Sequence, residues 1–211
     1  MDGVLIDSEP LHLESDLLLL GKYKVDVPEH YLEKYVGTTG SSMWEEIRNE
    51  FGIETELQEI LNAALSLKLK LLKKGSHAAI DGIPELLKDL HAKKILVGVA
   101  SSSPSMFIKE VLKRIGVERY VDTWISGENV DKGKPEPDIF LRMAELFGVE
   151  PSQCVVVEDS RNGVLAARRA GMKCIGFRNP NSGNQDIAKA DLVIEGIGEL
   201  SEKSIRALCD A

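Results

Sequence analysis

The strongest constraint on the fold is an apolar run that stops at two adjacent acids. Residues 154–160 read Cys-Val-Val-Val-Glu-Asp-Ser, and an unbroken β-branched run of this kind predicts a strand covered on both faces of a parallel sheet. The ligand crevice of an open parallel sheet lies outside the carboxyl ends of its strands. We therefore expect Glu158 and Asp159 at a ligand site, where carboxylate oxygens suit a hard cation such as Mg²⁺.

A second interpretation of the same stretch is structural. The two acids can simply begin a loop and interact favourably with the dipole of the helix that follows. Ser160 is a suitable N-cap for that helix, and Gly171 is a suitable residue to end it. The pattern leaves both interpretations open.

Helices and strands alternate from residue 81 onward. Short apolar runs predict further strands, and the helices between them begin at a proline or end at a glycine. The additional predicted strands cover residues 95–100, 124–126, 174–177 and 192–194. This alternation predicts an α/β fold with a doubly wound, mainly parallel sheet.

Residues 11–74 instead keep a helical spacing of apolar positions, with hardly a strand among them. We interpret residues 10–79 as an all-helical cap domain inserted after the first loop. The core domain then consists of residues 1–9 and 80–211. Near its end the helical block carries a group of lysines that we expect to form a solvated helix face. They are Lys68, Lys70, Lys73 and Lys74.

The charge balance limits the class of partner. The 211-residue chain has a formal net charge of -8, whereas nucleic-acid binding needs a basic surface. We expect no nucleic-acid partner, and an anionic ligand needs a local positive site. No apolar run is longer than Leu17 to Leu20, far short of a membrane span, and three cysteines without metal-ligand spacing suit a reducing compartment. We expect a cytoplasmic monomer with no membrane partner.

Two further polar segments follow predicted strands. Ser101, Ser102 and Ser103 lie between the strand of residues 95–100 and a predicted helix. Hydroxyls and N–H groups at such a junction suit an anion, although Ser103 can also be an ordinary N-cap. Lys134 lies in a Gly-Lys-Pro loop. Most loop lysines are only solvated, but beside carboxylates and hydroxyls a lysine can neutralise phosphoryl oxygens. Together these parts predict a site for phosphate and Mg²⁺.

Four segments resemble the motifs of a known family. Residues 1–8 are similar to the end of the signature loop of the haloacid dehalogenase superfamily, in particular its β-phosphoglucomutase-like phosphatase branch. The second, third and fourth motifs of that family resemble residues 100–103, 133–138 and 157–163. The order and spacing agree over nearly the whole chain. The resemblance implies a Rossmann-like core with a helical cap, and an enzyme that works through a phosphoaspartyl intermediate.

The resemblance also implies roles for individual residues. Asp2 is the general acid and base, and it offers its backbone carbonyl to Mg²⁺. Glu158 and Asp159 hold the same ion. The residues implied to bind phosphate are Ser101, Ser102 and Lys134, and Lys134 is also implied in catalysis. His12 matches a histidine that contacts the acid/base in the mutase branch, and its alternative is an ordinary surface position on a helix.

The implied nucleophile lies outside the printed sequence. In the family it precedes the acid/base by two positions, which here is one position before Met1, at the end of an apolar central strand. We therefore expect a gap between the strands of residues 95–100 and 154–158, with unpaired backbone groups beside it. Either the sequence is truncated or the chain has lost the chemistry, and the retained site residues favour truncation. A chain that starts at Met1 is expected to have no phosphoaspartyl turnover.

The cap turn of residues 36–40 bears on the substrate. The mutase carries an arginine there that grips a second phosphate, whereas this chain has Gly40 after Thr38 and Thr39. Without a guanidinium the turn lacks a bidentate phosphate clamp, unless Arg48 or Lys68 replaces it. We therefore expect a Mg²⁺-dependent phosphatase of small phosphorylated metabolites, such as a sugar phosphate, with Thr38 and Thr39 near the substrate.

Other functions are alternatives to this expectation. A sugar phosphomutase of the β-phosphoglucomutase type is the nearest, and an inactive phosphometabolite-binding protein would explain an absent nucleophile. A phosphoacceptor switch of the response-regulator type also combines acids, a hydroxyl and a lysine on a parallel sheet, but it needs no helical cap. A dehalogenase displaces a carbon-bound halide without Mg²⁺ and has no use for Asp2.

Overall fold

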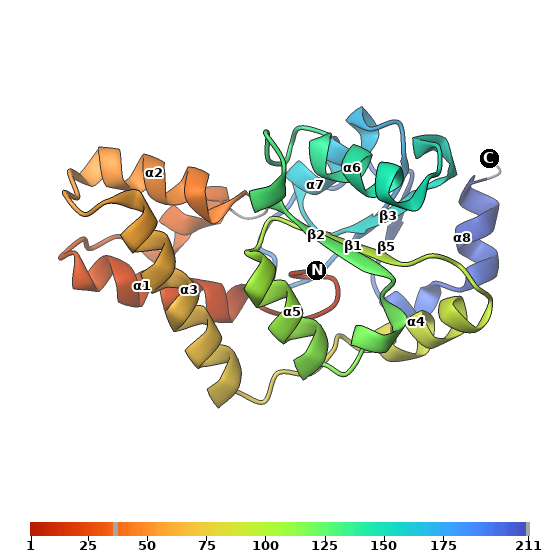
Figure 1. Ribbon diagram of the computed structural model, residues 1–211, viewed down its shortest axis with the longest axis horizontal. Coiled ribbons are helices and arrows are strands. Elements are labelled where there is room, and N and C mark those ends of the chain that lie inside the picture. Colours follow the sequence, from red (N-terminus) through yellow and green to blue (C-terminus); the bar gives the residue numbers. More distant parts are fainter. Residues whose placement is uncertain (36–37, 210–211) are drawn as a thin grey trace.

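The computed structural model describes residues 1–35 and 38–209 (Figure 1). Its helical part, the cap, lies beside an α/β part, the core, and both labelled chain ends lie in the core. The helical part covers nearly the same residues as the predicted cap domain, whose bounds stay a prediction. The cap elements are α1 (Glu9–Lys22), a 3-10 helix (Glu29–Tyr35), α2 (Gly40–Phe51) and α3 (Leu57–Lys74).

Helix α2 illustrates how the sequence builds the cap. Its buried side chains, Met43, Trp44 and Ile47, recur at helical spacing and pack with apolar residues of α1 and α3. Thr39 is the N-cap, because its Oγ1 accepts the backbone N–H of Ser42 at 3.3 Å. Burying a large apolar side chain of this kind stabilises the cap by about 1.5–3 kcal/mol.

In the described residues every pair of neighbouring strands is parallel. Helices α4 and α5 lie on one side of the strands and α6 and α7 on the other (Figure 1), which confirms the predicted doubly wound α/β fold. The strands are β1 (Gly98–Ser101), β2 (Thr123–Ser126), β3 (Val155–Glu158), β4 (Lys173–Phe177) and β5 (Leu192–Ile194). The helices are α4 (Ile83–Ala92), α5 (Ser105–Arg114), α6 (Asp138–Phe147), α7 (Arg161–Arg169) and α8 (Glu202–Cys209), with 3-10 helices at Glu118–Tyr120, Gly127–Asn129, Pro151–Gln153 and Ile197–Glu199.

The strands form two sheets rather than one. Strand β1 pairs with β2, and β3 pairs with β4, which pairs with β5. Within the described residues no strand pairs with the second edge of β1 or of β3, which is where the central strand was expected. Residues Val155–Val157 are consequently only half-buried, so the prediction of a strand covered on both faces is wrong for the chain as described.

Strand β1 is also shorter than the predicted strand of residues 95–100. Lys94 adopts a left-handed conformation, with φ 57°, as the chain leaves α4. The N–H of Val97 then donates to Oδ2 of Asp122 at 2.8 Å, so the strand ladder begins only at Gly98. Leu96 is 52% exposed. Residues 95–97 are therefore a connection, and the strand prediction there is wrong.

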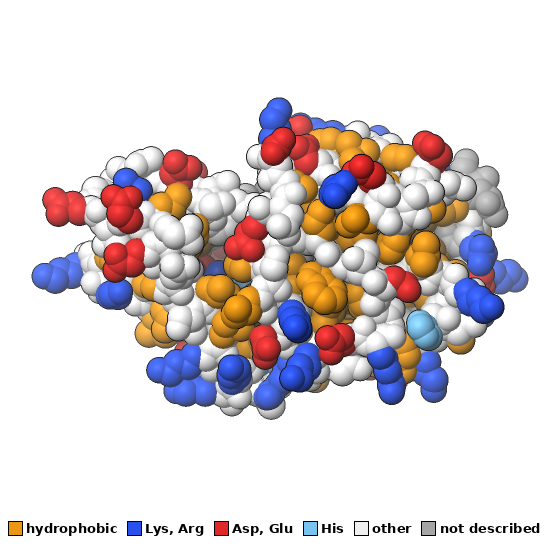
Figure 2. Space-filling view, in the orientation of Figure 1, with side chains coloured by type: hydrophobic (Ala, Val, Ile, Leu, Met, Phe, Trp, Pro, Cys, Tyr) orange, Lys and Arg blue, Asp and Glu red, His pale blue; other side chains and the backbone are white. Residues whose placement is uncertain are grey.

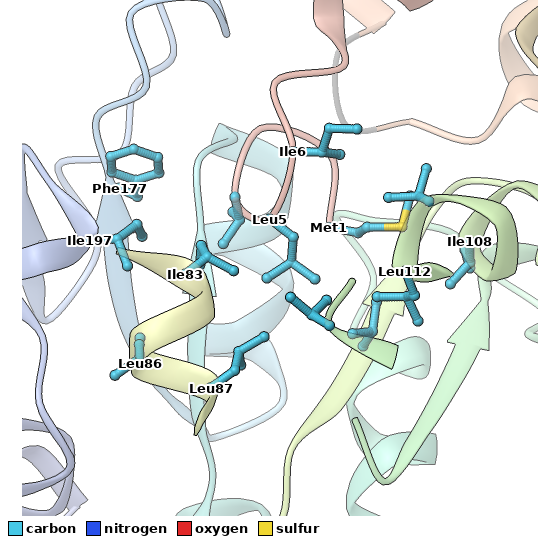
Figure 3. Packing of buried hydrophobic residues seen from close by; sticks show 14 of the residues in the cluster. Met1, Leu5, Ile6, Ile83, Leu86, Leu87, Ile108, Leu112, Phe177 and Ile197 are labelled. Atoms are coloured by element: carbon cyan, nitrogen blue, oxygen red, sulfur yellow. The ribbon is translucent and has the colours of Figure 1, made fainter. Parts of the chain in front are cut away.

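The first six residues form a loop anchored in the hydrophobic core. The N–H of Gly3 donates to the carbonyl of Ile6 at 2.9 Å, and the N–H of Ile80 donates to the carbonyl of Leu5 at 2.9 Å. Gly3 has φ 66°, a conformation that residues with a side chain rarely adopt. Met1, Leu5 and Ile6 pack among buried side chains of α4 and α5 (Figure 3). This packing fixes the position of Asp2 within the loop.

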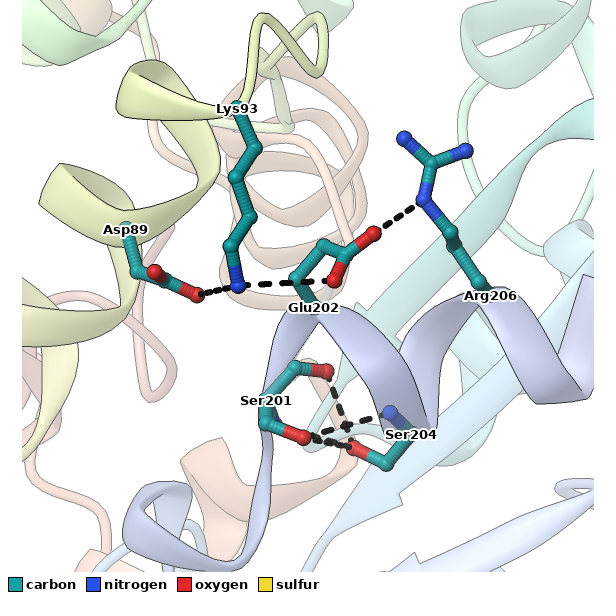
Figure 4. A network of polar contacts seen from close by, with 6 residues as sticks. All are labelled: Asp89, Lys93, Ser201, Glu202, Ser204 and Arg206. Carbon is teal, nitrogen blue, oxygen red and sulfur yellow. Dashed lines mark hydrogen bonds and ion pairs between the residues drawn. The ribbon is translucent and has the colours of Figure 1, made fainter.

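The C-terminal helix α8 packs Ile205 and Leu208 against the hydrophobic core and also makes polar contacts. Oγ of Ser201 accepts the N–H of Ser204 at 3.2 Å and so caps the helix. Glu202 pairs with Arg206 on the same helix and, at 3.4 Å, with Lys93 at the end of α4 (Figure 4). Such exposed ion pairs each contribute little to stability. In residues 1–35 and 38–209, no helix has the length and apolar character needed to cross a membrane.

Candidate active site

A cavity of about 720 Å³ lies between the cap and the core. The surface is indented where the two parts meet (Figure 2), and a volume of this size suits a small molecule. Residues 36 and 37 of the predicted cap turn lie outside the described residues. Every residue predicted for the site lines the cavity: Asp2, His12, Thr38, Thr39, Ser101, Ser102, Lys134, Glu158 and Asp159.

Asp2 is held by hydroxyl groups on both of its carboxylate oxygens. Oδ1 accepts from Ser8 at 2.7 Å, and Oδ2 accepts from Ser101 at 3.0 Å and from Ser103 at 2.9 Å. Nε2 of His12 lies 2.9 Å from Oδ1. Burial raises the pKa of Asp2, but the hydrogen bonds and charge of His12, the positive N-terminus and the Ser8 hydroxyl outweigh burial, so the pKa lies well below its usual range. The resting carboxyl is therefore ionised.

His12 lies on α1 and contacts both Asp2 and the core. Its ring packs against Phe107 at a centroid distance of 5.3 Å, and it is largely buried rather than on an open helix surface. Its Nδ1 is buried and has no hydrogen-bond partner among the described residues. The ring therefore connects the first cap helix to the acid of the N-terminal loop.

Lys134 is buried and forms an ion pair with Glu158. Its Nζ lies 3.4 Å from the carbonyl of Ala100 and 4.9 Å from the ring centroid of Phe140. The other oxygen of Glu158 accepts from Ser160 at 3.1 Å. Burial raises the pKa of Glu158, but the charge and hydrogen bond of Lys134 outweigh burial and lower it. The pair fixes the ammonium group at the cavity floor.

Two glycines make room for the carboxylates at the end of β3. A Cβ at Gly163 would lie 2.0 Å from the carboxyl carbon of Glu158, and a Cβ at Gly3 would lie 1.9 Å from Oδ2 of Asp159. Asp159 accepts a hydrogen bond from Ser182. Burial and the charge of Glu158 raise the pKa of Asp159 to about 7. Asp159 thus lies against Gly3, the residue that follows Asp2.

Several contacts depend on residues that the motifs did not single out for the site. Ser8 and Ser103 bind Asp2, Ser182 binds Asp159, and Nδ2 of Asn179 donates to the carbonyl of Gly3 at 2.9 Å. The N-cap position of α5 belongs to Pro104, so Ser103 is not an ordinary N-cap. The segment of residues 178–182, which is polar except for Pro180, directly follows β4, and that placement is the signal by which the loop could have been found.

The donors on the floor fit a hard divalent cation. Asp2, Glu158 and Asp159 place three carboxylates near the ammonium of Lys134, and the carboxylate donor atoms are all oxygens. Mg²⁺ is usually held by one or two carboxylates together with water and substrate phosphate. Over the described part of the chain, no three His, Cys, Asp or Glu side chains lie close enough to hold a metal ion by themselves. A cation here would need backbone, water or phosphate oxygens as well.

The cap wall of the cavity contains a second buried ion pair. Nζ of Lys68 on α3 lies 3.5 Å from Oδ1 of Asp16 on α1, and the two side chains are 13% and 7% exposed. The prediction that Lys68 belongs to a solvated face is therefore wrong, because α3 turns this residue toward α1. Lys70, Lys73 and Lys74 are exposed, as predicted.

The two cap threonines line the cavity, and both hydroxyls are engaged locally. Oγ1 of Thr38 donates to the carbonyl of Tyr35 at 2.7 Å, and Thr39 caps α2. The Thr39 methyl group lies against the core, since a Cβ added at Gly127 or Gly133 would be 3.1 or 3.0 Å from it. The threonines connect the cap to the core, and their contact with substrate stays a prediction.

Comparison with known proteins gives consistent similarities. A family model described as haloacid dehalogenase-like hydrolase matches residues 1–177. A phosphorylated carbohydrates phosphatase from Thermotoga maritima is 31% identical, over 83% of this chain and 81% of the relative. Fructose-1-phosphate phosphatase YqaB from Escherichia coli is 30% identical, over 84% of this chain and 93% of the relative. The crystal structure of β-phosphoglucomutase from Clostridium difficile is similar with a TM-score of 0.86 and 25% identity, over 99% of this chain and 94% of that chain.

Proposed function

Because the chain belongs to the haloacid dehalogenase-like hydrolases, we propose that it hydrolyses the phosphate ester of a small phosphorylated metabolite, such as a sugar phosphate, in the cavity between cap and core. The observation that carries this proposal is the placement of Asp2, the Lys134–Glu158 pair and Asp159 on one cavity floor. Relatives named as phosphatases of phosphorylated carbohydrates and of fructose 1-phosphate support the substrate class.

In this proposal Lys134 and Ser101 bind the phosphoryl oxygens. The Lys134 ammonium is a fixed positive charge at the floor, and the Ser101 hydroxyl already points at Asp2. A charge held in a water-poor site stabilises developing negative charge without reorganisation. The Glu158 carboxylate holds the Lys134 ammonium in position, so we assign Glu158 a positioning role in addition to its implied role at the metal.

Asp2 moves the proton. As a carboxylate bonded to Ser8, His12, Ser101 and Ser103 it can accept a proton from an attacking water molecule. To protonate the leaving oxygen it must first gain a proton, and a phosphoryl dianion bound beside it favours this by raising its pKa. The hydrogen bond and charge of His12 favour the ionised form of Asp2 over the protonated form.

Asp159, the backbone carbonyl of Asp2 and Glu158 are the proposed ligands of Mg²⁺. The ion would supply charge neutralisation between the carboxylates and the phosphate. The raised pKa of Asp159 and the excess of carboxylates over ammonium groups on the floor support this assignment. Removal of the metal with a chelator is expected to abolish phosphate release.

The proposed nucleophile is an aspartate directly before Met1, two positions before Asp2 as in the family pattern. The open second edges of β1 and β3 support a preceding strand that lies between them. We call the chain with such an apolar strand ending in Asp the extended chain. The proposed compartment is the cytoplasm, and the expected monomeric state and lack of nucleic-acid or membrane partners stay predictions.

The test is Mg²⁺-dependent phosphate release from a panel of sugar phosphates by the extended chain. Replacing Asp2→Asn should lower kcat by about 10²–10⁴-fold, the usual contribution of general acid–base catalysis. Asp7→Asn, directly after the same loop, is the matched control and should change kcat less than threefold (about 0.6 kcal/mol or less). Undiminished activity of the Asp2→Asn variant, or phosphate release by the chain that starts at Met1, would contradict the proposal. Isomerised sugar phosphate without phosphate release would identify a mutase.

A further inference from the structure

The cap wall of the cavity has features that the proposed chemistry does not use. Asp16 and Lys68 line the cavity from two different cap helices, and the indole of Trp44 lines it from a third. Both members of the ion pair are largely buried. Burying two opposite charges usually costs more free energy than their attraction returns, unless further hydrogen bonds satisfy them. The pair therefore calls for a role beyond stabilising the cap.

The geometry of the pair leaves hydrogen-bonding capacity unused. The separation of 3.5 Å between Nζ and Oδ1 exceeds the usual charge-assisted hydrogen bond of about 2.7–2.9 Å. Oδ1 of Asp16 is buried and accepts no hydrogen bond within the described residues, and Nε1 of Trp44 has no partner there either. Three cap helices thus each contribute one polar residue to the wall, with an acceptor oxygen on Asp16, an ammonium group on Lys68 and an N–H donor on Trp44.

A hydroxyl group fits this arrangement and a phosphate does not. A hydroxyl can donate to Asp16 and accept from Lys68 or Trp44 at the same time, because it carries both functions. A phosphate dianion offers only acceptors, so the attraction of Lys68 is opposed by the repulsion of Asp16. The pair consequently distinguishes hydroxyl groups from a second phosphate group.

The remaining charges of the cap wall also disfavour the binding of a second phosphate group. Among the described lining residues the lysines are Lys68 and Lys134, His12 is engaged by Asp2, and no arginine is present. Arg48, one of the two residues named as a replacement for the mutase arginine, is not a lining residue. Glu9 and Glu33 add two more carboxyl groups on the cap side. In the proposed function Lys134 binds the first phosphate. The remaining lysine, Lys68, is paired with Asp16, so its attraction for a second phosphate is countered by the Asp16 carboxylate.

We propose that Asp16 and Lys68 form a hydroxyl-binding subsite, completed by Trp44, which selects monophosphates of polyols such as sugars and disfavours bisphosphates. The proposal rests on the proposed function for its catalytic readout, and it assigns the substrate preference to named cap residues. Apolar side chains beside the subsite, including Leu61 and Leu65, can cover the carbon skeleton.

The test compares three substrates of the extended chain: sorbitol 6-phosphate, phenyl phosphate and fructose 1,6-bisphosphate. Asp16→Asn keeps the shape of the side chain and removes its charge. We expect it to raise KM for sorbitol 6-phosphate about tenfold, the effect of weakening a hydrogen bond to a charged group, and to leave phenyl phosphate within about twofold, since that ester has no hydroxyl to bind. For fructose 1,6-bisphosphate KM should fall, because Lys68 is no longer opposed. A rise in KM for one substrate and a fall for the other would distinguish loss of the subsite from a general loss of structure, which would affect all substrates alike.

Three further variants complete the design. Lys68→Met should raise KM for both the polyol monophosphate and the bisphosphate, whereas Lys70→Met, on the exposed side of α3, should leave all three substrates unchanged. The double variant Asp16→Asn/Lys68→Met should show less than the sum of the single effects, because the two residues act together. Equal shifts for all three substrates, or a wild-type preference for the bisphosphate, would overturn the proposal.

A binding experiment separates this proposal from the proposed function. If the extended chain hydrolyses no phosphate ester, the proposed function fails, and calorimetric titration with sorbitol 6-phosphate still decides the subsite. About tenfold weaker binding to Asp16→Asn than to its parent supports the subsite, by the same hydrogen-bond argument. Equal binding, or binding to neither, overturns it.

Discussion

Removing one partner of the buried Lys134–Glu158 pair should destabilise the protein strongly. Lys134→Met removes the ammonium partner of the buried Glu158 carboxylate. Among the described residues, the Ser160 hydroxyl is then the remaining hydrogen-bond donor to that carboxylate. An uncompensated buried charge of this kind costs about 3–5 kcal/mol. The methionine can still pack against Phe140, which lies beside the Lys134 side chain, so little of the loss comes from packing.

The double variant Lys134→Met/Glu158→Gln decides whether charge is the cause. A neutral glutamine needs no ammonium partner, so the double variant should be more stable than Lys134→Met alone. The coupling free energy between the two sites should then be about 1–3 kcal/mol. The measurement is urea unfolding in the presence of a chelator, followed by circular dichroism. Lys132→Met, an exposed lysine of the same loop, is the control and should stay within about 0.5 kcal/mol of the parent. Purely additive single and double effects would refute the reasoning.

Two further substitutions test the N-terminal loop. Gly3→Ala puts a methyl group onto the Asp159 carboxylate at a residue with φ 66°, so it should lower the free energy of unfolding by about 2–4 kcal/mol from strain and overpacking. Gly21→Ala in α1, where a Cβ meets nothing within 4 Å, should instead raise it by about 0.5–1 kcal/mol, and equal effects in urea unfolding would contradict the structure. His12→Asn removes the charge that lowers the pKa of Asp2. A depressed carboxyl pKa stabilises the fold above the unfolded pKa, here 3.8, and that stability is lost as the pH falls toward the folded pKa. The deficit of His12→Asn in unfolding free energy should therefore be present at pH 5 and shrink toward pH 3, and a deficit that does not depend on pH would exclude Asp2 as its source.

The sequence predicted the elements that depend on local pattern. The apolar run before Glu158 and the Gly-Lys-Pro loop around Lys134 were sufficient to predict that their side chains meet at one cavity. The Ser160 N-cap is confirmed, because its Oγ accepts the N–H of Gly163 at 3.0 Å. Such features repeat general rules of strand ends and helix starts, so a single sequence reveals them.

Contacts between distant segments were beyond the same reasoning. Asn179 bonds to Gly3 and Ser182 bonds to Asp159, and no spacing rule relates a turn after β4 to a loop at the other end of the chain. Lys68 looked like a solvated lysine because its helix neighbours are lysines, and only the packing of α3 against α1 brings it to Asp16. The early start predicted for β1 failed for a similar reason, since the Asp122 side chain takes the N–H of Val97.

The contact between Thr39 and two core glycines links the spacing of cap and core to residues that do not themselves line the cavity. Gly127 and Gly133 leave just enough room for the Thr39 methyl group, and the loop of Gly133 also carries Lys134. A side chain at either glycine would press against the Thr39 methyl group and push the cap away from the cavity floor. The separation between the cap wall and the cavity floor thereby depends on the small size of two residues that do not line the cavity. If the proposed subsites are correct, variation at these two residues is a route by which the preference for longer or shorter substrates can change.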